Sequence, residues 1–385
     1  MTDAATRKAI SGSAIAGNGT SGQATSGSAA SGAIPDRALV QAATALITGS
    51  ASAAAAWRKA GAPSAAAFNR ALTERYGLGA AALAGARQRR SVRLAYGGPY
   101  DAPMTLRYLG RDPHNQAEVV QGRRYSRFIT LDKRPLPVTL TLAARTCTLE
   151  FPARLRAGEI LRLIDTTGHM LGLRQPVAAF QRTAEQHDVL RPIVQAMPGV
   201  RMIQTPNLWE ALSWAIIGQQ INLAFAYKLR NRLIFLGNGH DAPAPRPLPF
   251  PTPGQVLGLT PDALKQAQFS RQKIAYLLEL ARQFETDGLA ALSLDTAAPE
   301  EIEARLLSIK GLGRWSVAYG MMRGLGHLDA LPVGDAGLRQ ALRARFNLEA
   351  VPDPETQERL MAPFRPYRGL ATYYLWKSLD PANFG

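Results

Sequence analysis

The sequence predicts a multidomain protein in which an α+β sheet domain is followed by an all-helical domain, with a disordered tail and a small helical module at the N-terminus. Three observations support this fold class. Of the first 34 residues, 25 are Ser, Gly, Ala or Thr. Several segments within 91–177 alternate apolar and polar residues with period two, which is typical of half-buried strands. From residue 178 onward, apolar residues recur at helical spacing.

The N-terminal region is expected to contain two segments. Residues 1–34 carry too few large apolar side chains to form a core, so they are predicted to be a disordered tail. Residues 35–90 are predicted to form a small helical module. Within it, Ser64 would cap a helix whose buried face carries Phe68 and Leu72.

Residues 91–177 are expected to form the α+β domain with an antiparallel sheet. The alternating segments are 127–131, 138–142 and 146–151, and helical stretches are expected around 102–110 and 156–165.

Residues 178–385 are expected to be helical, with a Pro-rich extended connector at 241–254. The predicted helical segments are 207–236, 261–287, 298–308, 314–325, 336–346 and 355–380.

Charge and composition narrow the class of function. The net charge of +16 favours a polyanionic partner such as nucleic acid, although a basic surface that binds nothing would give the same value. The single cysteine, Cys147, excludes a disulfide framework within the chain, and the five histidines show no metal-ligand spacing. No apolar run has the length of a membrane span and no signal-peptide core is present, so we expect a cytoplasmic protein.

The most informative segment is Lys310-Gly311-Leu312-Gly313-Arg314, which joins two predicted helices. The glycines let the backbone approach a ligand closely, and the N-terminus of the following helix suits a phosphate anion. The two basic residues add side-chain charge on either side. Asp335 follows 24 positions after Gly311. A phosphate site followed by a single acid indicates an enzyme that acts on nucleic acid.

These residues resemble the signature of the helix-hairpin-helix DNA glycosylase superfamily, a Gly-x-Gly hairpin followed by a catalytic Asp. Within it, the chain is similar to the DNA-3-methyladenine glycosylase II type. The resemblance runs from about Leu94 to Trp376 and includes 217–220, 250–253 and 363–367. It implies a monomeric bacterial enzyme, associated with the nucleoid, that excises alkylated bases of the 3-methyladenine and 7-methylguanine type from double-stranded DNA in base excision repair.

The resemblance implies that Asp335 is the catalytic carboxylate, which would stabilise positive charge on the sugar as the glycosidic bond breaks. From the residues alone, Asp335 is also a good helix N-cap, and both roles are compatible. Bifunctional members of the superfamily carry a Schiff-base lysine at the hairpin position that Trp315 occupies. We therefore expect hydrolysis by water without strand cleavage.

The resemblance further implies that the base is flipped into an aromatic pocket formed by Trp315, Tyr319 and Tyr373, with Tyr108 from the sheet domain and Trp214. Trp315 and Tyr319 lie at helical spacing, so a core stripe is the alternative. An electron-rich aromatic face attracts a cationic alkylated base. Such a base leaves as a neutral molecule, so no strong general acid is required.

Three further residues are expected to contact DNA. Gln220 occupies the position of the residue that fills the gap left by a flipped nucleotide, and the alternative is a glutamine inside a helix that bonds a neighbouring turn. Ser270 and Lys273 begin another helix and are expected to touch phosphate, unless they form an ordinary solvated cap. The sequence indicates no cofactor and no metal, and leaves open a monovalent cation at the hairpin carbonyls.

Two other classes of function remain as alternatives. Residues 35–90 resemble one helix-turn-helix unit of the AraC-type regulators, a module fused to alkylation-repair glycosylases in some bacteria. The chain could therefore be a DNA-binding regulator of the alkylation response without catalysis. An alkyl-transferring repair protein would need a nucleophilic Cys, and Cys147 in a Thr-Cys-Thr context does not provide one.

Overall fold

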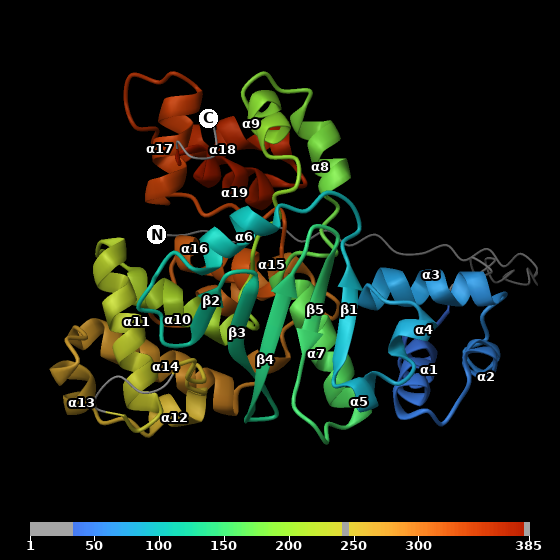
Figure 1. Cartoon of the computed structure of the whole chain (residues 1–385). Coiled ribbons are helices and arrows are strands. Elements are labelled where there is room, and N and C mark those ends of the chain that lie inside the picture. Colours follow the sequence, from blue (N-terminus) through green and yellow to red (C-terminus); the bar gives the residue numbers. More distant parts are fainter. Residues whose placement is uncertain (1–33, 241–245, 381–385) are drawn as a thin grey trace, which may run out of the picture. The chain divides into compact units, whose positions relative to one another are not determined.

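The protein's structure is a computed structural model that describes residues 34–240 and 246–380 (Figure 1). The tail predicted at 1–34 lies outside these residues except for Ile34, and so does the part of the Pro-rich connector at 241–245. The predicted fold class is confirmed, because a five-stranded antiparallel sheet precedes a region built from helices.

The sheet has the strand order β1-β5-β4-β3-β2, and all of its pairs are antiparallel. The strands are β1 (Ser91–Ala95), β2 (Glu118–Gln121), β3 (Arg124–Leu131), β4 (Arg134–Leu142) and β5 (Thr146–Glu150). The three predicted strands lie within β3, β4 and β5, where every second side chain is buried. The two predicted helices are also present, as α6 (Ala102–Leu109) and α7 (Ala157–Met170).

Between residue 34 and the sheet, the structure has five helices: α1 (Asp36–Thr48), α2 (Ala53–Lys59), α3 (Ala65–Tyr76), α4 (Ala80–Leu83) and α5 (Ala86–Arg89). The Ser64 hydroxyl caps α3 as expected, because it accepts a hydrogen bond from the Ala67 N–H at 3.1 Å. The buried residues Leu46 and Leu72 of these helices belong to the same hydrophobic core as Leu94 of β1 and Ile164 of α7.

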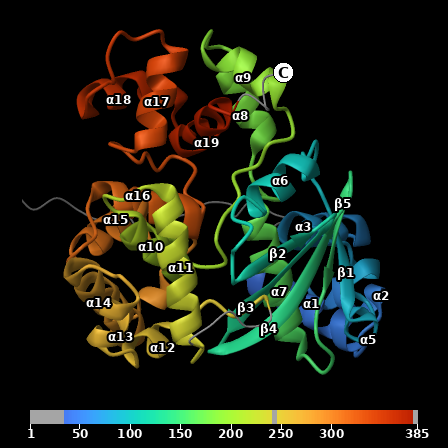
Figure 2. The ribbon, with the colours of Figure 1, turned by 60° about the vertical axis from the view of Figure 1, so that its left-hand side comes forward.

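The packing of α1 and α3 against α7 can be followed in Figure 2. Arg75 of α3 forms ion pairs with Asp165 of α7 at 2.5 Å and with Asp36 of α1 at 3.5 Å. The boundary predicted at residue 90 therefore divides segments that share one core.

The helical region begins after α7. Its elements are α8 (Val177–Ala184), α9 (Leu190–Ala196), α10 (Leu208–Gly218), α11 (Leu223–Gly237), α12 (Pro253–Leu257), α13 (Pro261–Gln266), α14 (Arg271–Thr286), η1 (Leu289–Ala291), α15 (Pro299–Leu307), α16 (Arg314–Gly320), the π-helical η2 (Met321–Leu325), α17 (Ala336–Arg345), α18 (Pro354–Met361), η3 (Ala362–Phe364) and α19 (Arg368–Ser378). Three predicted helices are interrupted. The segment 207–236 breaks after Gly218, the segment 261–287 breaks after Gln266, and the segment 355–380 breaks near Pro366.

A buried network of four charged residues joins the sheet to α10 and α11. The Arg127 guanidinium of β3 donates to Glu210 of α10 at 2.7 Å and to Glu118 of β2 at 3.0 Å, and Arg230 of α11 donates to Glu210 at 2.9 Å. Burial works against these charges, but the two arginines outweigh it and hold the pKa of Glu118 below its usual range. The network fixes the sheet domain, including α6, against the helices that carry the predicted site.

Candidate active site and DNA-binding surface

The hairpin between α15 and α16 is anchored on one side and open on the other. Gly311 has a φ of +100°, and a Cβ at this position would lie 2.3 Å from the Tyr276 ring. Leu312 is buried beneath the turn. Gly313 is the N-cap of α16, and no atom lies within 4 Å of the position that its Cβ would take. The first N–H groups of α16 therefore begin at an open surface, as the predicted phosphate site requires.

The turn between α10 and α11 is tied to this hairpin. The Gln219 side-chain amide donates to the Gly311 carbonyl at 2.9 Å and contacts the Ser316 hydroxyl at 3.1 Å. Gln220 follows in a left-handed conformation, with a φ of +56°, and its side chain is exposed. It is therefore not inside a helix, which removes the structural alternative considered for it. Three residues further on, Leu223 is 58% exposed and is the most exposed large apolar side chain in the described part of the chain.

The expectation that Lys273 touches phosphate is not supported by its position. Its side chain is 7% exposed, and the ammonium group donates to the carbonyls of Ile216, Ile217 and Gln219 at 2.7–2.9 Å. Lys273 thus satisfies the free carbonyls at the end of α10. Burial also lowers the pKa of its ammonium to about 8.

The other predicted phosphate contacts lie at the surface. The Ser270 hydroxyl is exposed and caps α14 by accepting from the Lys273 N–H at 3.3 Å. Lys310 is exposed directly before the hairpin, whereas Arg314 is exposed and paired with Glu358 at 2.9 Å. Their contacts with DNA stay predictions.

Asp335 is half-buried and accepts hydrogen bonds from three N–H groups. Its Oδ1 accepts from the Leu338 N–H at 2.7 Å and from the Trp376 indole at 2.8 Å, and its Oδ2 accepts from the Trp315 indole at 3.0 Å. The first bond makes Asp335 the N-cap of α17, as the sequence indicated. The two indoles come from α16 and α19, so the carboxylate is fixed where three helices meet.

Two helices, α16 and α19, each place a pair of aromatic side chains near Asp335. On α16, the Trp315 and Tyr319 rings lie 5.6 Å apart. On α19, the Trp376 and Tyr373 rings lie 6.3 Å apart, and the Tyr373 ring meets Tyr108 of α6 edge-on at 5.9 Å. The structure therefore brings Trp315, Tyr319, Tyr373 and Tyr108 together, although Tyr373 is almost completely buried.

Three cationic side chains surround Tyr108, and the sequence reasoning missed all of them. The charged groups of Arg111 and Lys377 each lie 4.0 Å from the centre of its ring, and the Arg323 guanidinium lies at 5.4 Å. Burial alone would raise the pKa of the Tyr108 hydroxyl, but the three cations outweigh it and lower the pKa to about 8. Two of these residues had a detectable signal, because Arg323 and Lys377 follow Tyr319 and Tyr373 by one helical turn.

A cavity of about 50 Å³ forms the inner end of this site. Tyr108, Trp214 and Tyr319 line it, together with Arg111 and Arg323, whereas Trp315 and Tyr373 do not. Trp214 itself stacks on Tyr227 with a ring distance of 5.3 Å. Three of the five predicted pocket aromatics thus line the cavity, and two do not.

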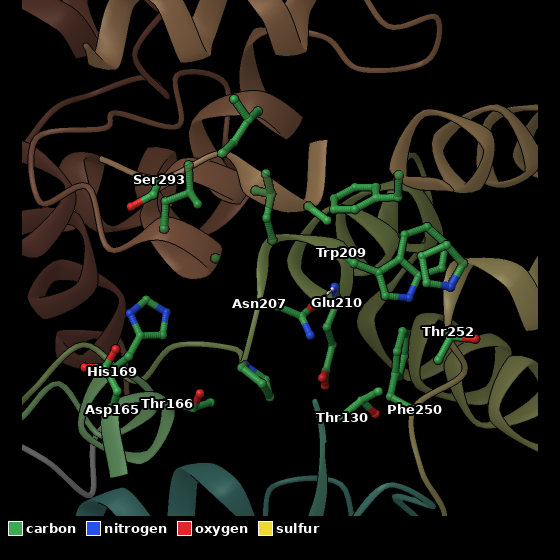
Figure 3. A pocket seen from close by; sticks show the side chains of 18 of the residues that line it. Thr130, Asp165, Thr166, His169, Asn207, Trp209, Glu210, Phe250, Thr252 and Ser293 are labelled. Carbon is green, nitrogen blue, oxygen red and sulfur yellow. Dashed lines mark hydrogen bonds between the residues drawn. The ribbon is translucent and has the colours of Figure 1, made fainter. Parts of the chain in front are cut away.

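A separate cavity of about 650 Å³ lies at the N-terminal end of α10, away from the hairpin (Figure 3). Figure 3 shows His169 on one side of it and Trp209 and Phe250 on the other. Burial, reinforced by Arg174, lowers the pKa of His169 to about 4. None of the predicted site residues lines this cavity.

No group of three or more His, Cys, Asp or Glu side chains in the described part of the chain could hold a metal ion. No helix within 34–240 or 246–380 is long and apolar enough to cross a membrane.

The sheet-plus-helices architecture and the hairpin are those of base excision repair proteins that contain a helix-hairpin-helix. Residues 213–366 match the family model for "HhH-GPD superfamily base excision DNA repair protein", and residues 91–207 match the AlkA N-terminal domain. The chain therefore belongs to the HhH-GPD superfamily and is of the type that carries an AlkA N-terminal domain. Neither match includes residues 35–90, so their likeness to AraC-type regulators stays a prediction.

Individual proteins agree with this family. A DNA-3-methyladenine glycosylase of Bacillus subtilis is 29% identical over 54% of this chain and 69% of its own length. The solved structure of a 3-methyladenine DNA-glycosylase from Archaeoglobus fulgidus has a TM-score of 0.63 at 23% identity, covering 74% of this chain and 96% of that protein. An 8-oxoguanine glycosylase/lyase from Clostridium acetobutylicum has a TM-score of 0.57 at 14% identity, covering 77% and 97%. Since a glycosylase/lyase shares the fold, the fold alone does not decide between hydrolysis and lyase chemistry.

Proposed function

We propose that the protein is a monofunctional DNA glycosylase that flips alkylated bases, of the 3-methyladenine and 7-methylguanine type, out of duplex DNA and hydrolyses their N-glycosidic bond. The observation that carries this proposal is Asp335, which three N–H donors hold, one of them the indole of Trp315 in the first turn of the helix that follows the open hairpin. The matched relatives, which are named DNA-3-methyladenine glycosylases, support the class of substrate.

In this proposal, Asp335 supplies the negative charge that the reaction requires. As the bond between C1′ and the base nitrogen breaks, positive charge develops on the sugar, and a fixed carboxylate stabilises it without having to reorganise. The three hydrogen bonds stabilise the ionised carboxylate and fix its direction. Water then forms the new bond to C1′, and the product is an abasic site.

DNA would be held by backbone and side-chain contacts along one edge. The N–H groups after Gly313 would bind a phosphate, with Lys310 beside them. The turn at Gln220 and Leu223 would enter the duplex, where an apolar side chain can fill the place of a flipped nucleotide. The bond from Gln219 to Gly311 keeps this turn at a fixed distance from the phosphate site. A monovalent cation at the hairpin carbonyls would add to this phosphate site, although the Gly311 carbonyl already accepts from Gln219.

The direct test is the release of bases from alkylated duplex DNA by the purified protein, measured by chromatography. We expect release by the natural protein and nearly none by Asp335→Asn, which keeps the acceptor for the helix cap but loses the charge. The variant should bind abasic-site DNA about as well as the natural protein. Normal turnover by folded Asp335→Asn would contradict the assignment, and no release by the natural protein would favour a regulator without catalysis.

The monofunctional character has its own test. Borohydride present during turnover traps any Schiff base between a lysine and the sugar. We expect no trapped adduct, and strand breaks only after alkali is added. If an adduct forms, comparison with Lys377→Met would show whether the amine beside Tyr108 is the one that reacts.

A further inference from the structure

A groove outside the site described above runs along the free edge of the sheet. Strand β2 is the last strand in the order, so only one of its edges is paired, with β3. Helix α6 contacts β2, and the two lie side by side in Figures 1 and 2. This edge groove, of about 830 Å³, has β2 on one side and Pro103, Leu106 and Arg107 of α6 on the other. Val119 and Val120 point to opposite faces of the sheet and both line the groove, so it follows the edge of β2.

The backbone of β2 offers unpaired hydrogen-bonding groups to the edge groove. A two-residue turn joins β2 to β3, so Gln121 and Arg124 form the first hydrogen-bonded pair, and Val119 belongs to the next. The N–H and C=O groups of Glu118 and Val120 therefore point away from β3. No group in the described part of the chain bonds to them there. A strand edge with free backbone groups is a template for pairing with another extended chain.

The side chains along the edge groove are largely apolar. Leu106 of α6 and Val119 and Val120 of β2 are half-buried, and the buried Leu142 of β4 is also part of the lining. Successive side chains of an added strand point in opposite directions, so every second one would pack on these residues. The groove therefore favours a chain with apolar side chains at alternate positions.

The exposed charge at the edge groove is positive. Arg123 lies at the turn that ends β2, Arg107 lies on α6, and Arg246 lies at the opposite end, where its guanidinium donates to the Pro113 carbonyl at 2.8 Å. All three arginines are exposed. Within 34–240 and 246–380, no carboxylate lies within 4.0 Å of the guanidinium of Arg123 or Arg246.

Two carboxylates also line the edge groove, but both are directed inward. Asp112 is 9% exposed and accepts from the His114 N–H at 3.0 Å and from the Asn231 side chain at 3.2 Å. Glu118 accepts from Arg127 at 3.0 Å and belongs to the buried network described above. The charge that a ligand meets at the opening is therefore that of the arginines, which attracts an anionic chain.

We infer that the edge groove binds an extended acidic segment of a partner protein, which has apolar side chains at alternate positions and pairs with β2 as a further strand. Residues 1–33 fit less well, because they carry Arg7 and Lys8 against one acid, Asp3. Pairing of two copies through β2 would bring the arginines of both grooves together. The inference goes beyond the proposed function, since no residue assigned to DNA or to the base lines the edge groove.

The test uses three fluorescein-labelled peptides of eight residues, in which Glu alternates with Val, Lys alternates with Val, or Glu alternates with Gly. Fluorescence anisotropy with the full-length protein measures their affinities. We expect the Glu-Val peptide to bind about 10-fold more tightly than either of the others, because it alone matches both the charge and the apolar side chains of the groove. Equal affinities for the three peptides, or a preference for the Lys-Val peptide, would overturn the inference.

Val120→Pro tests the backbone contact. It removes an N–H that faces away from β3, so the pairing of β2 with β3 is kept, as is usual for proline on an edge strand. We expect the Glu-Val peptide to bind about 10-fold more weakly to this variant. Unchanged affinity in a folded variant would overturn strand pairing.

The double variant Arg123→Glu/Arg246→Glu tests the charge, and it decides the question if Val120→Pro does not fold. It should weaken the Glu-Val peptide and strengthen the Lys-Val peptide, a reversal that unfolding does not produce. Arg93→Glu is the matched control, because Arg93 is an exposed arginine on β1, at the other edge of the sheet. It should leave both affinities unchanged.

The remaining outcomes identify a different occupant and overturn the inference. Equal losses in the double variant and in Arg93→Glu would show a general effect of net charge. Competition by an oligonucleotide of eight deoxythymidines as strong as that of the unlabelled Glu-Val peptide would make nucleic acid the occupant. Dimerisation that Val120→Pro abolishes would make a second copy the occupant. Base release from alkylated DNA tests the proposed function separately.

Discussion

At the scale of single residues, the site depends on donors that come from distant parts of the chain. Asp335 obtains one hydrogen bond from its own helix and two from indoles on α16 and α19. The helix cap was predictable because it is local in sequence. The contribution of Trp376 was not, because it lies 41 positions further along and reaches Asp335 only through tertiary packing.

The hydrogen bond from Trp376 gives a first prediction. Trp376→Phe keeps an aromatic ring but removes one N–H donor to a charged acceptor, a bond worth about 1.5–3 kcal/mol. If Asp335 acts in its ionised, oriented form, the single-turnover rate of base release should fall roughly 10–100-fold. Trp209→Phe is the matched control, since its indole donates to the Pro251 carbonyl in the separate cavity region. Equal effects of both substitutions on the rate would argue against a special role for Trp376.

The titration of Tyr108 gives a second prediction. The three cations lower the pKa of its hydroxyl to about 8, and burial lowers the pKa of Lys377 to about 8. The Lys377 ammonium lies 4.0 Å from the Tyr108 ring, so the two groups titrate as a pair, and raising the pH from about 7 to about 9 removes positive charge from this part of the site. A less positive site repels a cationic base less, so the single-turnover rate of 7-methylguanine release should rise over this range, and it should rise less in Tyr108→Phe. A constant rate of 7-methylguanine release across this range would contradict the prediction. The groups that face Tyr108 are Arg111, Tyr319, Arg323, Tyr373 and Lys377.

At the scale of elements, the two glycines of the hairpin differ in their surroundings, because Gly311 packs against Tyr276 and Gly313 faces open space. Gly313→Val places a side chain on an open surface, so it should leave the unfolding temperature unchanged and weaken binding to all duplexes alike, because backbone contacts carry no sequence information. Gly311→Ala is the contrasting variant. An alanine at this position would have to adopt a φ of +100°, and its Cβ would clash with the Tyr276 ring. The substitution should therefore lower the unfolding temperature. Loss of binding by Gly313→Val for only one lesion would contradict a phosphate contact.

The same scale shows how far the sequence could predict the elements. Strands β3 to β5 were predictable because one face is buried and the alternation is regular. The break between α10 and α11 was missed because Ile221 and Leu223 continue the apolar pattern across it, although Asn222 is a local signal whose side chain caps α11 by accepting from the Phe225 N–H at 2.9 Å. Tertiary contacts add to this local cap, because Lys273 caps α10 and Gln219 bonds to the hairpin. Lys273 was misjudged for the same reason, since nothing near it in sequence shows that it is buried.

At the scale of the whole molecule, the N-terminal helices belong to the core of the sheet domain. Sequence patterns showed helices at 35–90 but could not show what those helices pack against. The structure places Leu46 and Leu72 in one hydrophobic cluster with residues of β1 and α7. If the N-terminal helices were dispensable, the face of α7 that they cover would not need them to keep its apolar side chains from solvent.

This gives the last prediction. A chain that begins at Ser91 would expose the apolar face of α7 and lose the ion pair between Arg75 and Asp165, so we expect it to be insoluble or to unfold at a much lower temperature. A chain that begins at Ile34 keeps every described contact and should release bases at the natural rate. Leu72→Ala tests the same packing without truncation and should cost about 2–5 kcal/mol in the free energy of unfolding. A stable, fully active chain beginning at Ser91 would show that α7 and the sheet fold without the N-terminal helices, and that these helices serve DNA binding or another role.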